Sequence, residues 1–156
     1  MSRSRLLDAV AERKNLLIDY VPHSVALGMV VLDAKPGEAW IKIPYDEKLV
    51  GNPATGVIHG GVITTLLDST AGVAVMTALP DLRSIATLDL RIDYMKPATP
   101  GRDVIGHCRC YKLTRHIAFV HGSAYHEDPH DPIATAAMTF MLGANQAPPP
   151  APAVQS

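Results

Sequence analysis

Cysteine, aromatic residues and net charge are all scarce in this sequence. The 156 residues include two cysteines, 5% are aromatic, and the formal net charge is −1. So small a net charge argues against a strong electrostatic binder of nucleic acid. Cys108 and Cys110 are too few for a metal site by themselves. They are expected to be free thiols on one face of a strand, in a reducing compartment.

Long apolar runs and clustered metal ligands are also lacking. No stretch is long and uniformly apolar enough to span a bilayer, and residues 1–8 lack the apolar segment of a signal peptide. The expected location is the cytoplasm, with no membrane partner. Of the remaining candidate ligands, His121 and His126 fall on opposite faces of a strand and His130 falls in a loop. We therefore expect neither a metal nor any other cofactor.

Small and aliphatic residues dominate instead, since 47% of the chain is hydrophobic. This suffices for one domain with a sizeable core. The residue patterns predict a helix over 3–20, strands over 25–33 and 39–44, a loop over 45–55, a long helix over 61–79, and strands over 84–94, 103–112, 117–127 and 133–142. The Ala/Pro-rich residues 144–156 are expected to form a flexible tail, which leaves a single domain over 1–143.

The helix over 61–79 carries apolar or small side chains on nearly all sides. Such a helix has to be buried around most of its circumference. The strands that follow it are joined by short connections, which favour antiparallel pairing. We therefore predict an α+β fold in which a curved antiparallel sheet wraps around one long central helix, with an additional helix at the N-terminus.

Residues 52–72 combine a Gly/Pro loop with the start of this helix. His59, Gly60 and Gly61 lie at the junction, and Asp68 is the one acidic residue of the apolar run that follows. Burying a lone carboxylate is costly unless something uses it. This stretch is therefore the first candidate for a functional site.

Two sequence blocks give the chain a family resemblance. The first consists of Asn52, Gly56, His59-Gly60-Gly61, Asp68 and Gly72. The second is Thr87-Leu88-Asp89-Leu90 followed by Tyr94-Met95-Lys96-Pro97-Ala98. Together they resemble the PaaI-like group of hotdog-fold thioesterases over about residues 25–142. The resemblance implies a hotdog fold, hydrolysis of acyl-CoA without a cofactor, and a homo-oligomer, either a dimer or a homotetramer built as a dimer of dimers.

The glycines at the helix start can carry part of this chemistry. A helix N-terminus presents unpaired N–H groups, and glycine lets a ligand approach the backbone closely. The Gly61 N–H is thus a candidate donor to the oxyanion of a thioester, with Gly60 beside it in the binding site. The alternative is that Gly60 and Gly61 only permit a tight turn.

Asp68 is the candidate catalytic carboxylate. It can attack the thioester carbonyl or act as general base to a water molecule. The alternative is a structural carboxylate, satisfied by N–H groups or paired with Arg91. His59 and Asn52 are assigned to contact the substrate carbonyl or to hold the loop, and Thr87 to orient the attacking water.

Further residues are candidates for binding the two halves of the substrate. Leu66, Val73 and Met76 lie on the predicted helix and are assigned to the acyl pocket. Lys112 and Arg115 flank a turn and are assigned to the phosphates of CoA, although such a residue is more often a solvated surface charge.

Helix geometry separates the two catalytic candidates. Gly61 and Asp68 are seven residues apart, which is about 10 Å along a helix axis. One carbonyl cannot easily contact both, whereas two antiparallel helices about a two-fold axis bring Gly61 of one chain near Asp68 of the other. We therefore expect an obligate dimer with shared sites. The competing functions are a non-catalytic acyl-CoA or hydrophobic-ligand binding protein and a hydratase or dehydratase of the same fold.

Overall fold

The computed structural model describes residues 16–81 and 83–143. Its helical elements are α2 (Leu16–Asp19), α3 (Pro22–Ala26), the 3-10 helix η1 (Glu47–Leu49) and α4 (Gly60–Ala78). Its strands are β1 (Val30–Lys35), β2 (Glu38–Ile43), β3 (Val50–Asn52), β4 (Val57–Ile58), β5 (Ile85–Tyr94), β6 (Val104–Leu113), β7 (Ile117–Tyr125) and β8 (Ala134–Leu142).

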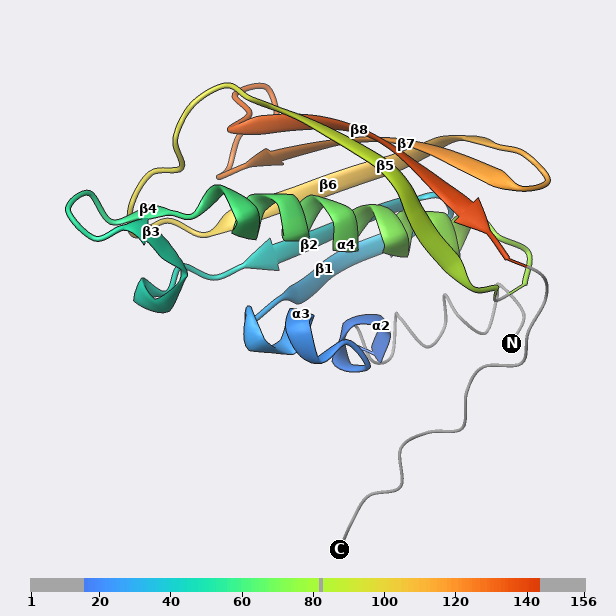
Figure 1. Ribbon diagram of the computed structural model, residues 1–156, viewed down its shortest axis with the longest axis horizontal. Coiled ribbons are helices and arrows are strands. Elements are labelled where there is room, and N and C mark those ends of the chain that lie inside the picture. The colour runs from blue at the N-terminus through green and yellow to red at the C-terminus, as the bar shows by residue number, and fades with distance from the viewer. Residues whose placement is uncertain (1–15, 82, 144–156) are drawn as a thin grey trace, which may run out of the picture.

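Six of the strands form one antiparallel sheet that curves over α4 (Figure 1). The strand order is β1-β2-β6-β7-β8-β5, and β3 and β4 form a separate short pair. The predicted α+β hotdog architecture is therefore confirmed. Since α4 is followed by β5 at one end of this order, the helix connects the hairpin β1–β2 to the opposite edge of the sheet.

The core lies between α4 and the concave face of the sheet. Fully buried residues of the helix, such as Leu66 and Val75, meet fully buried strand residues such as Ile41 and Val120. Gly106 on β6 permits this close approach, because a Cβ there would lie 2.9 Å from Leu66 Cγ. By length and composition α4 could cross a membrane, contrary to our expectation, but the sheet curves over it and 50% of it is buried, as in the core helix of a soluble protein.

The structure corrects the prediction for the region before β1. Pro22 begins a helix instead of ending one, because proline suits the first helical turn, where no N–H acceptor is needed. The strand expected over 25–33 therefore starts only at Val30. Of the helix expected over 3–20, residues 16–19 form α2. Residues 3–15 and the tail 144–156 lie outside the described residues.

A β-bulge in β5 changes which residues of that strand face α4. Thr87 pairs with Phe140 and Asp89 with Thr139, so Leu88 is the extra residue between them. Before the bulge Ile85 and Thr87 face α4, whereas after it Leu90, Ile92 and Tyr94 are the residues on that side. Strict alternation along a strand would place Thr87 and Tyr94 on opposite faces. The extra residue brings both to α4.

Candidate active site

The N-terminus of α4 is capped by a residue of the predicted site. His59 is the N-cap, and its Nδ1 accepts a hydrogen bond of 2.9 Å from the Gly61 N–H. Both residues are exposed. A Cβ on Gly61 would lie 2.9 Å from Nδ1, so any side chain there would displace the imidazole. The Gly61 N–H, which is the predicted oxyanion donor, is thus already hydrogen-bonded to one acceptor, His59 Nδ1.

Asn52 shapes the loop that leads into this cap. Its Oδ1 accepts from the Ala54 N–H at 3.0 Å, and its carbonyl accepts from the Gly56 N–H at 2.9 Å. The loop expected over 45–55 also contains η1 and β3, which the sequence analysis missed. Gly51 in β3 packs against His59, where a Cβ would lie 2.9 Å from the His59 Cα. The glycine itself was the signal for this close approach.

Asp68 and Thr87 are brought into direct contact. The Thr87 hydroxyl donates to Asp68 Oδ1 at 2.8 Å, across the gap between α4 and β5. Asp68 is only half-buried, so its charge remains partly solvated. The alternative partner, Arg91, pairs with Asp93 at 3.3 Å on the exposed side of β5.

A buried thiol on β6 packs against α4 beside Leu67, the residue before Asp68. Cys108 is completely buried, and its Sγ lies 3.5 Å from the Leu67 carbonyl oxygen. Burial, and secondarily the negative charge of Asp68, raise the pKa of the Cys108 thiol far above its usual range. Cys110 is half-buried, and burial raises the pKa of its thiol as well. Both cysteines are free, as expected, and Cys108 is held in its unreactive protonated form.

A mainly apolar pocket of about 240 Å³ opens at Asp68 and Thr87. Val73 and Met76 line it as predicted residues, whereas Leu66 is completely buried in the core beside Gly106. The pocket walls that were not predicted come from four elements outside the motif, α2, α3, β5 and β8. They are Ile18, Val21, Ser24, Ile85 and Phe140, and Val21 lies between α2 and α3. Their separation in sequence left no local pattern to identify them.

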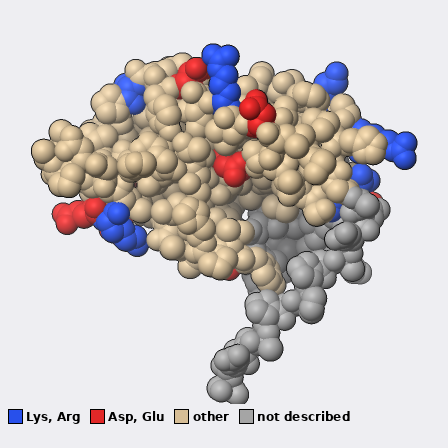
Figure 2. Space-filling view, viewed as in Figure 1, with Lys and Arg blue, Asp and Glu red and all other residues tan. Residues whose placement is uncertain are grey.

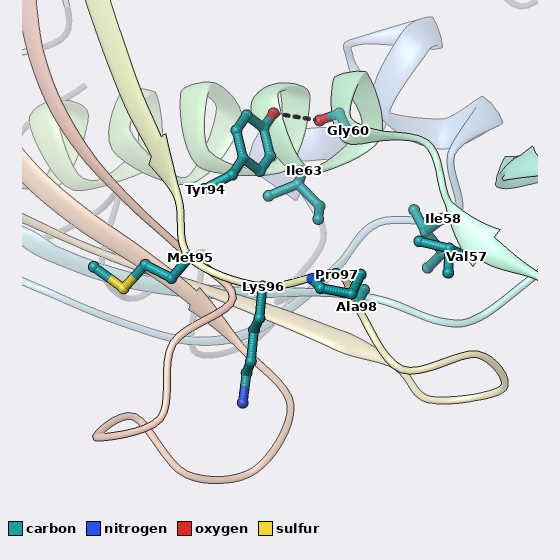
Figure 3. A pocket seen from close by; sticks show the side chains of 9 residues that line it. All are labelled: Val57, Ile58, Gly60, Ile63, Tyr94, Met95, Lys96, Pro97 and Ala98. Carbon is teal, nitrogen blue, oxygen red and sulfur yellow. Dashed lines mark hydrogen bonds between the residues drawn. The ribbon is translucent and has the colours of Figure 1, made fainter.

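A second pocket of about 340 Å³ lies at the other end of the motif (Figure 3). Its lining residues belong to β4, the start of α4, the last residue of β5 and the segment that follows β5: Val57, Ile58, Gly60, Ile63, Tyr94, Met95, Lys96, Pro97 and Ala98. In Figure 3 the Tyr94 ring points toward the first turn of α4, where its hydroxyl bonds to the Gly60 carbonyl. Each predicted half-site, Gly60–Gly61 and Asp68, therefore has a pocket of its own.

The predicted CoA-binding cations lie elsewhere. Lys112 and Arg115 are exposed at the β6–β7 turn. Two residues before Lys112, the Cys110 N–H donates to the Gly37 carbonyl. The Gly37 N–H in turn donates to Thr77 Oγ1, near the end of α4. The two cations are thus near the C-terminal end of α4, and a single protomer does not bring them to Gly61.

The candidate metal ligands among the histidines have other partners. His126 lies between the Thr99 N–H at 2.9 Å and the Asp103 carbonyl at 2.7 Å, and His121 packs on the Tyr111 ring. Across residues 16–81 and 83–143, no three His, Cys, Asp or Glu side chains cluster closely enough to hold a metal ion.

Comparison with solved structures identifies close relatives of the fold. A crystallised protein from Pseudomonas aeruginosa is 43% identical, with a TM-score of 0.75 over 83% of this chain and 96% of that one. A variant of the phenylacetic acid degradation protein PaaI from Thermus thermophilus is 28% identical, with a TM-score of 0.67 over 77% of this chain and 97% of that one.

Curated relatives match over different lengths. YigI of Salmonella typhimurium, a medium/long-chain acyl-CoA thioesterase, is 27% identical over 82% of this chain and 90% of its own. A Halobacterium salinarum protein, named for an inferred esterase activity, is 45% identical over 75 residues, and the match spans half of that relative. The family model of the thioesterase superfamily matches residues 55–133, which include Asp68, Thr87 and Tyr94. The chain therefore belongs to the thioesterase superfamily, as a PaaI-like member with the hotdog fold.

Proposed function

We propose that this protein hydrolyses acyl-CoA thioesters to a free acid and CoA. The observation that carries the proposal is the Asp68–Thr87 hydrogen bond at the mouth of an apolar pocket. A carboxylate in this position can act on a thioester whose acyl group enters the pocket. The names of the relatives, several of which are acyl-CoA thioesterases, support the same substrate class.

Thr87 favours the general-base form of the reaction. Because its proton is donated to Asp68, Thr87 Oγ1 can only accept from a water molecule. A water that donates to both Asp68 and Thr87 would direct a lone pair at the carbonyl carbon. Asp68 takes its proton, the tetrahedral intermediate collapses, and the thiolate of CoA leaves. In the alternative, Asp68 attacks the carbonyl and water then hydrolyses the resulting anhydride.

Gly61 is proposed to stabilise the oxyanion of the intermediate through its N–H. The substrate carbonyl would take the place of His59 Nδ1 on that N–H. One acceptor then replaces another at an exposed position, so the exchange leaves no N–H unpaired. Asn52 supports the site by holding the loop before His59.

The separation of Gly61 and Asp68 is the basis for proposing a dimer with shared sites. β5 is an edge strand of ten residues, and Leu88 on it and Met95 just after it are 52% and 59% exposed. A long edge with exposed apolar side chains is suited to pairing with a second copy. The face of the molecule drawn in Figure 2 is largely uncharged, in keeping with such contacts. We also propose that the dimers pair into tetramers and that the protein is located in the cytoplasm.

The pocket at Asp68 limits the acyl group. A cavity of about 150 Å³ is known to hold benzene, and this pocket is about 240 Å³. We propose acyl groups of that order, such as one aromatic ring with a short linker or a chain of short to medium length. Lys112 and Arg115 are proposed to meet the CoA phosphates only within the oligomer.

Substitution of Asp68 tests the function. Release of CoA from a panel of acyl-CoAs is followed with a thiol-reactive dye for the wild type, Asp68→Asn and the matched control Asp93→Asn. We expect kcat to fall by about 10²–10⁴ in Asp68→Asn and to be unchanged in the control. Unchanged cleavage by Asp68→Asn refutes the mechanism, and no cleavage by the wild type favours a binding protein.

Two further measurements test the details. In a single turnover in ¹⁸O-labelled water, general-base catalysis by Asp68 places the label directly in the acid product. If Asp68 is the nucleophile, the label enters the Asp68 carboxylate first. Mixing Asp68→Asn and Gly61→Ala protomers tests the shared site. Random dimers should regain about a quarter of the wild-type sites, because each mixed dimer contains one intact site. A catalytically competent monomer would refute the sharing.

A further inference from the structure

The end of β5 contains a hydrogen-bond network that the proposed mechanism has not used. The Tyr94 hydroxyl donates to the Gly60 carbonyl at 2.7 Å and lies 2.8 Å from Thr64 Oγ1. Thr64 Oγ1 itself lies 3.2 Å from the same carbonyl. Figure 3 shows the tyrosine reaching from β5 to the first turn of α4. Two hydroxyls thus converge on one backbone oxygen.

That oxygen belongs to a functional peptide group. The Gly60 carbonyl and the Gly61 N–H are the two ends of one planar peptide unit. A hydrogen bond to the carbonyl end holds the plane in one orientation. It also polarises the unit, so that the N–H end becomes a stronger donor. The Gly61 N–H is the group proposed to bind the oxyanion.

The setting of Tyr94 favours this role over a purely structural one. Its side chain is 51% exposed, so its hydroxyl does not need a protein partner to compensate for burial. A helix carbonyl has two lone pairs, and the amide four residues later occupies only one. The second lone pair at Gly60 is open to the two hydroxyls, and Tyr94 lies closer to the oxygen, at 2.7 Å, than Thr64 Oγ1, at 3.2 Å.

We propose that Tyr94 is a positioning residue of the thioesterase reaction, acting through the Gly60–Gly61 peptide. Its hydroxyl orients and polarises this peptide, and thereby strengthens the Gly61 N–H toward the developing oxyanion. The inference rests on the proposed function. It concerns the transition state more than the bound substrate, because the oxyanion bears more charge than the thioester carbonyl.

Tyr94→Phe removes the hydroxyl and keeps the ring. One oxyanion donor contributes about 10²–10³ to kcat, and polarisation changes a hydrogen bond by about 10–30%. We therefore expect kcat to fall about two- to eightfold, with KM and Tm unchanged. The matched control is Tyr111→Phe, since Tyr111 is 52% exposed on β6 and contacts rings instead of α4.

A second readout does not depend on turnover. In protein labelled with ¹⁵N-glycine, the Gly61 amide proton should move upfield in Tyr94→Phe and remain in place in Tyr111→Phe. Thr64→Val, which removes the second hydroxyl, should give a smaller shift in the same direction. An unchanged Gly61 resonance together with unchanged kcat in Tyr94→Phe overturns the inference, and so does a rise in KM with kcat unchanged.

The two proposals fail in different ways. If the wild type cleaves no acyl-CoA, the proposed function fails, yet the Gly61 resonance still reports whether Tyr94 polarises the peptide. If Asp68→Asn abolishes cleavage and Tyr94→Phe has no effect on either readout, only the inference about Tyr94 fails.

Discussion

The Thr87 hydroxyl on β5 donates a hydrogen bond of 2.8 Å to Oδ1 of Asp68 on α4. This contact fixes one oxygen of the carboxylate against the sheet and joins two elements that are separated by the turn after α4. A hydrogen bond to a charged group contributes about 1.5–3 kcal/mol. The pairing of Thr87 with Asp68 is therefore strong enough to control the direction of the carboxylate.

The first prediction concerns a substitution that removes this hydroxyl without changing the shape of the side chain. Thr87→Val should lower kcat about 10- to 100-fold, because Asp68 loses its orienting donor and the water loses an acceptor. Thr87→Ser keeps the hydroxyl and should retain activity within a few-fold. Steady-state kinetics with one acyl-CoA suffice. Equal rates for the valine and serine variants would exclude a role for the hydroxyl.

The second prediction concerns the pocket wall next to α3. Val21 lines the pocket at Asp68, whereas Val25 is 54% exposed on the same short segment and does not line it. Val21→Phe should fill part of the 240 Å³ and lower kcat/KM most for the bulkiest acyl group that the wild type accepts. Val25→Phe is the matched control and should leave the acyl preference unchanged. The same change of acyl preference in Val21→Phe and Val25→Phe would mean that this pocket does not bind the acyl group.

The third prediction is a pH dependence of stability at Asp103. The Tyr45 N–H, at 2.9 Å from Oδ1, and then Lys42, at 3.0 Å from Oδ2, hold the pKa of this carboxyl below its usual value. A lowered folded-state pKa stabilises the protein above the unfolded pKa, and this contribution is lost as the pH falls through the folded value. The side chain is 44% exposed, so solvent screening limits the effect to under about 1 kcal/mol.

Asp103→Asn keeps the acceptor for Tyr45 and removes the charge. The variant should be less stable than the wild type at pH 7, and the difference should disappear as the pH falls below about 4. Urea unfolding over a pH series measures it, with Asp33→Asn as an exposed control. A difference that is constant with pH would contradict the assignment to charge.

The fourth prediction is that the protein's own thiols do not react in the CoA assay. Burial raises the pKa of both Cys108 and Cys110. Because the thiolate is the reactive form, the native protein should show no rapid reaction with the dye. Guanidinium should then expose both thiols. A fast native thiol would show that β6 opens on the time scale of the assay.

The elements with a strong period were predictable from the sequence. The buried helix over 61–79 was found within one residue of α4, because apolar groups on all its sides left only one way to bury them. The start of β1 was misplaced, since the apolar residues around Val25 read as a strand while Pro22 set up a helical turn. β3 and β4 are too short to produce a period at all.

The site was predictable only where its residues share one motif. His59, Gly61 and Asp68 were predicted together, and their spacing along α4 predicted that Gly61 and Asp68 belong to two half-sites. Val21 and Phe140 contribute to the pocket from distant elements, and no spacing rule links them to Asp68. Tyr94 was missed as a partner of Gly60 because no spacing rule links the end of β5 to the first turn of α4.

The bulge at Leu88 has a consequence for how this gene can change. Thr87 and Tyr94 both reach α4 only because β5 contains one residue more than its partner strand requires. Loss of a single codon there would restore regular pairing with β8 and still yield a well-formed sheet. It would also turn either Thr87 or Tyr94 away from the helix. In-frame deletions in β5 should therefore separate a folded protein from an active one, which substitutions in the core seldom do.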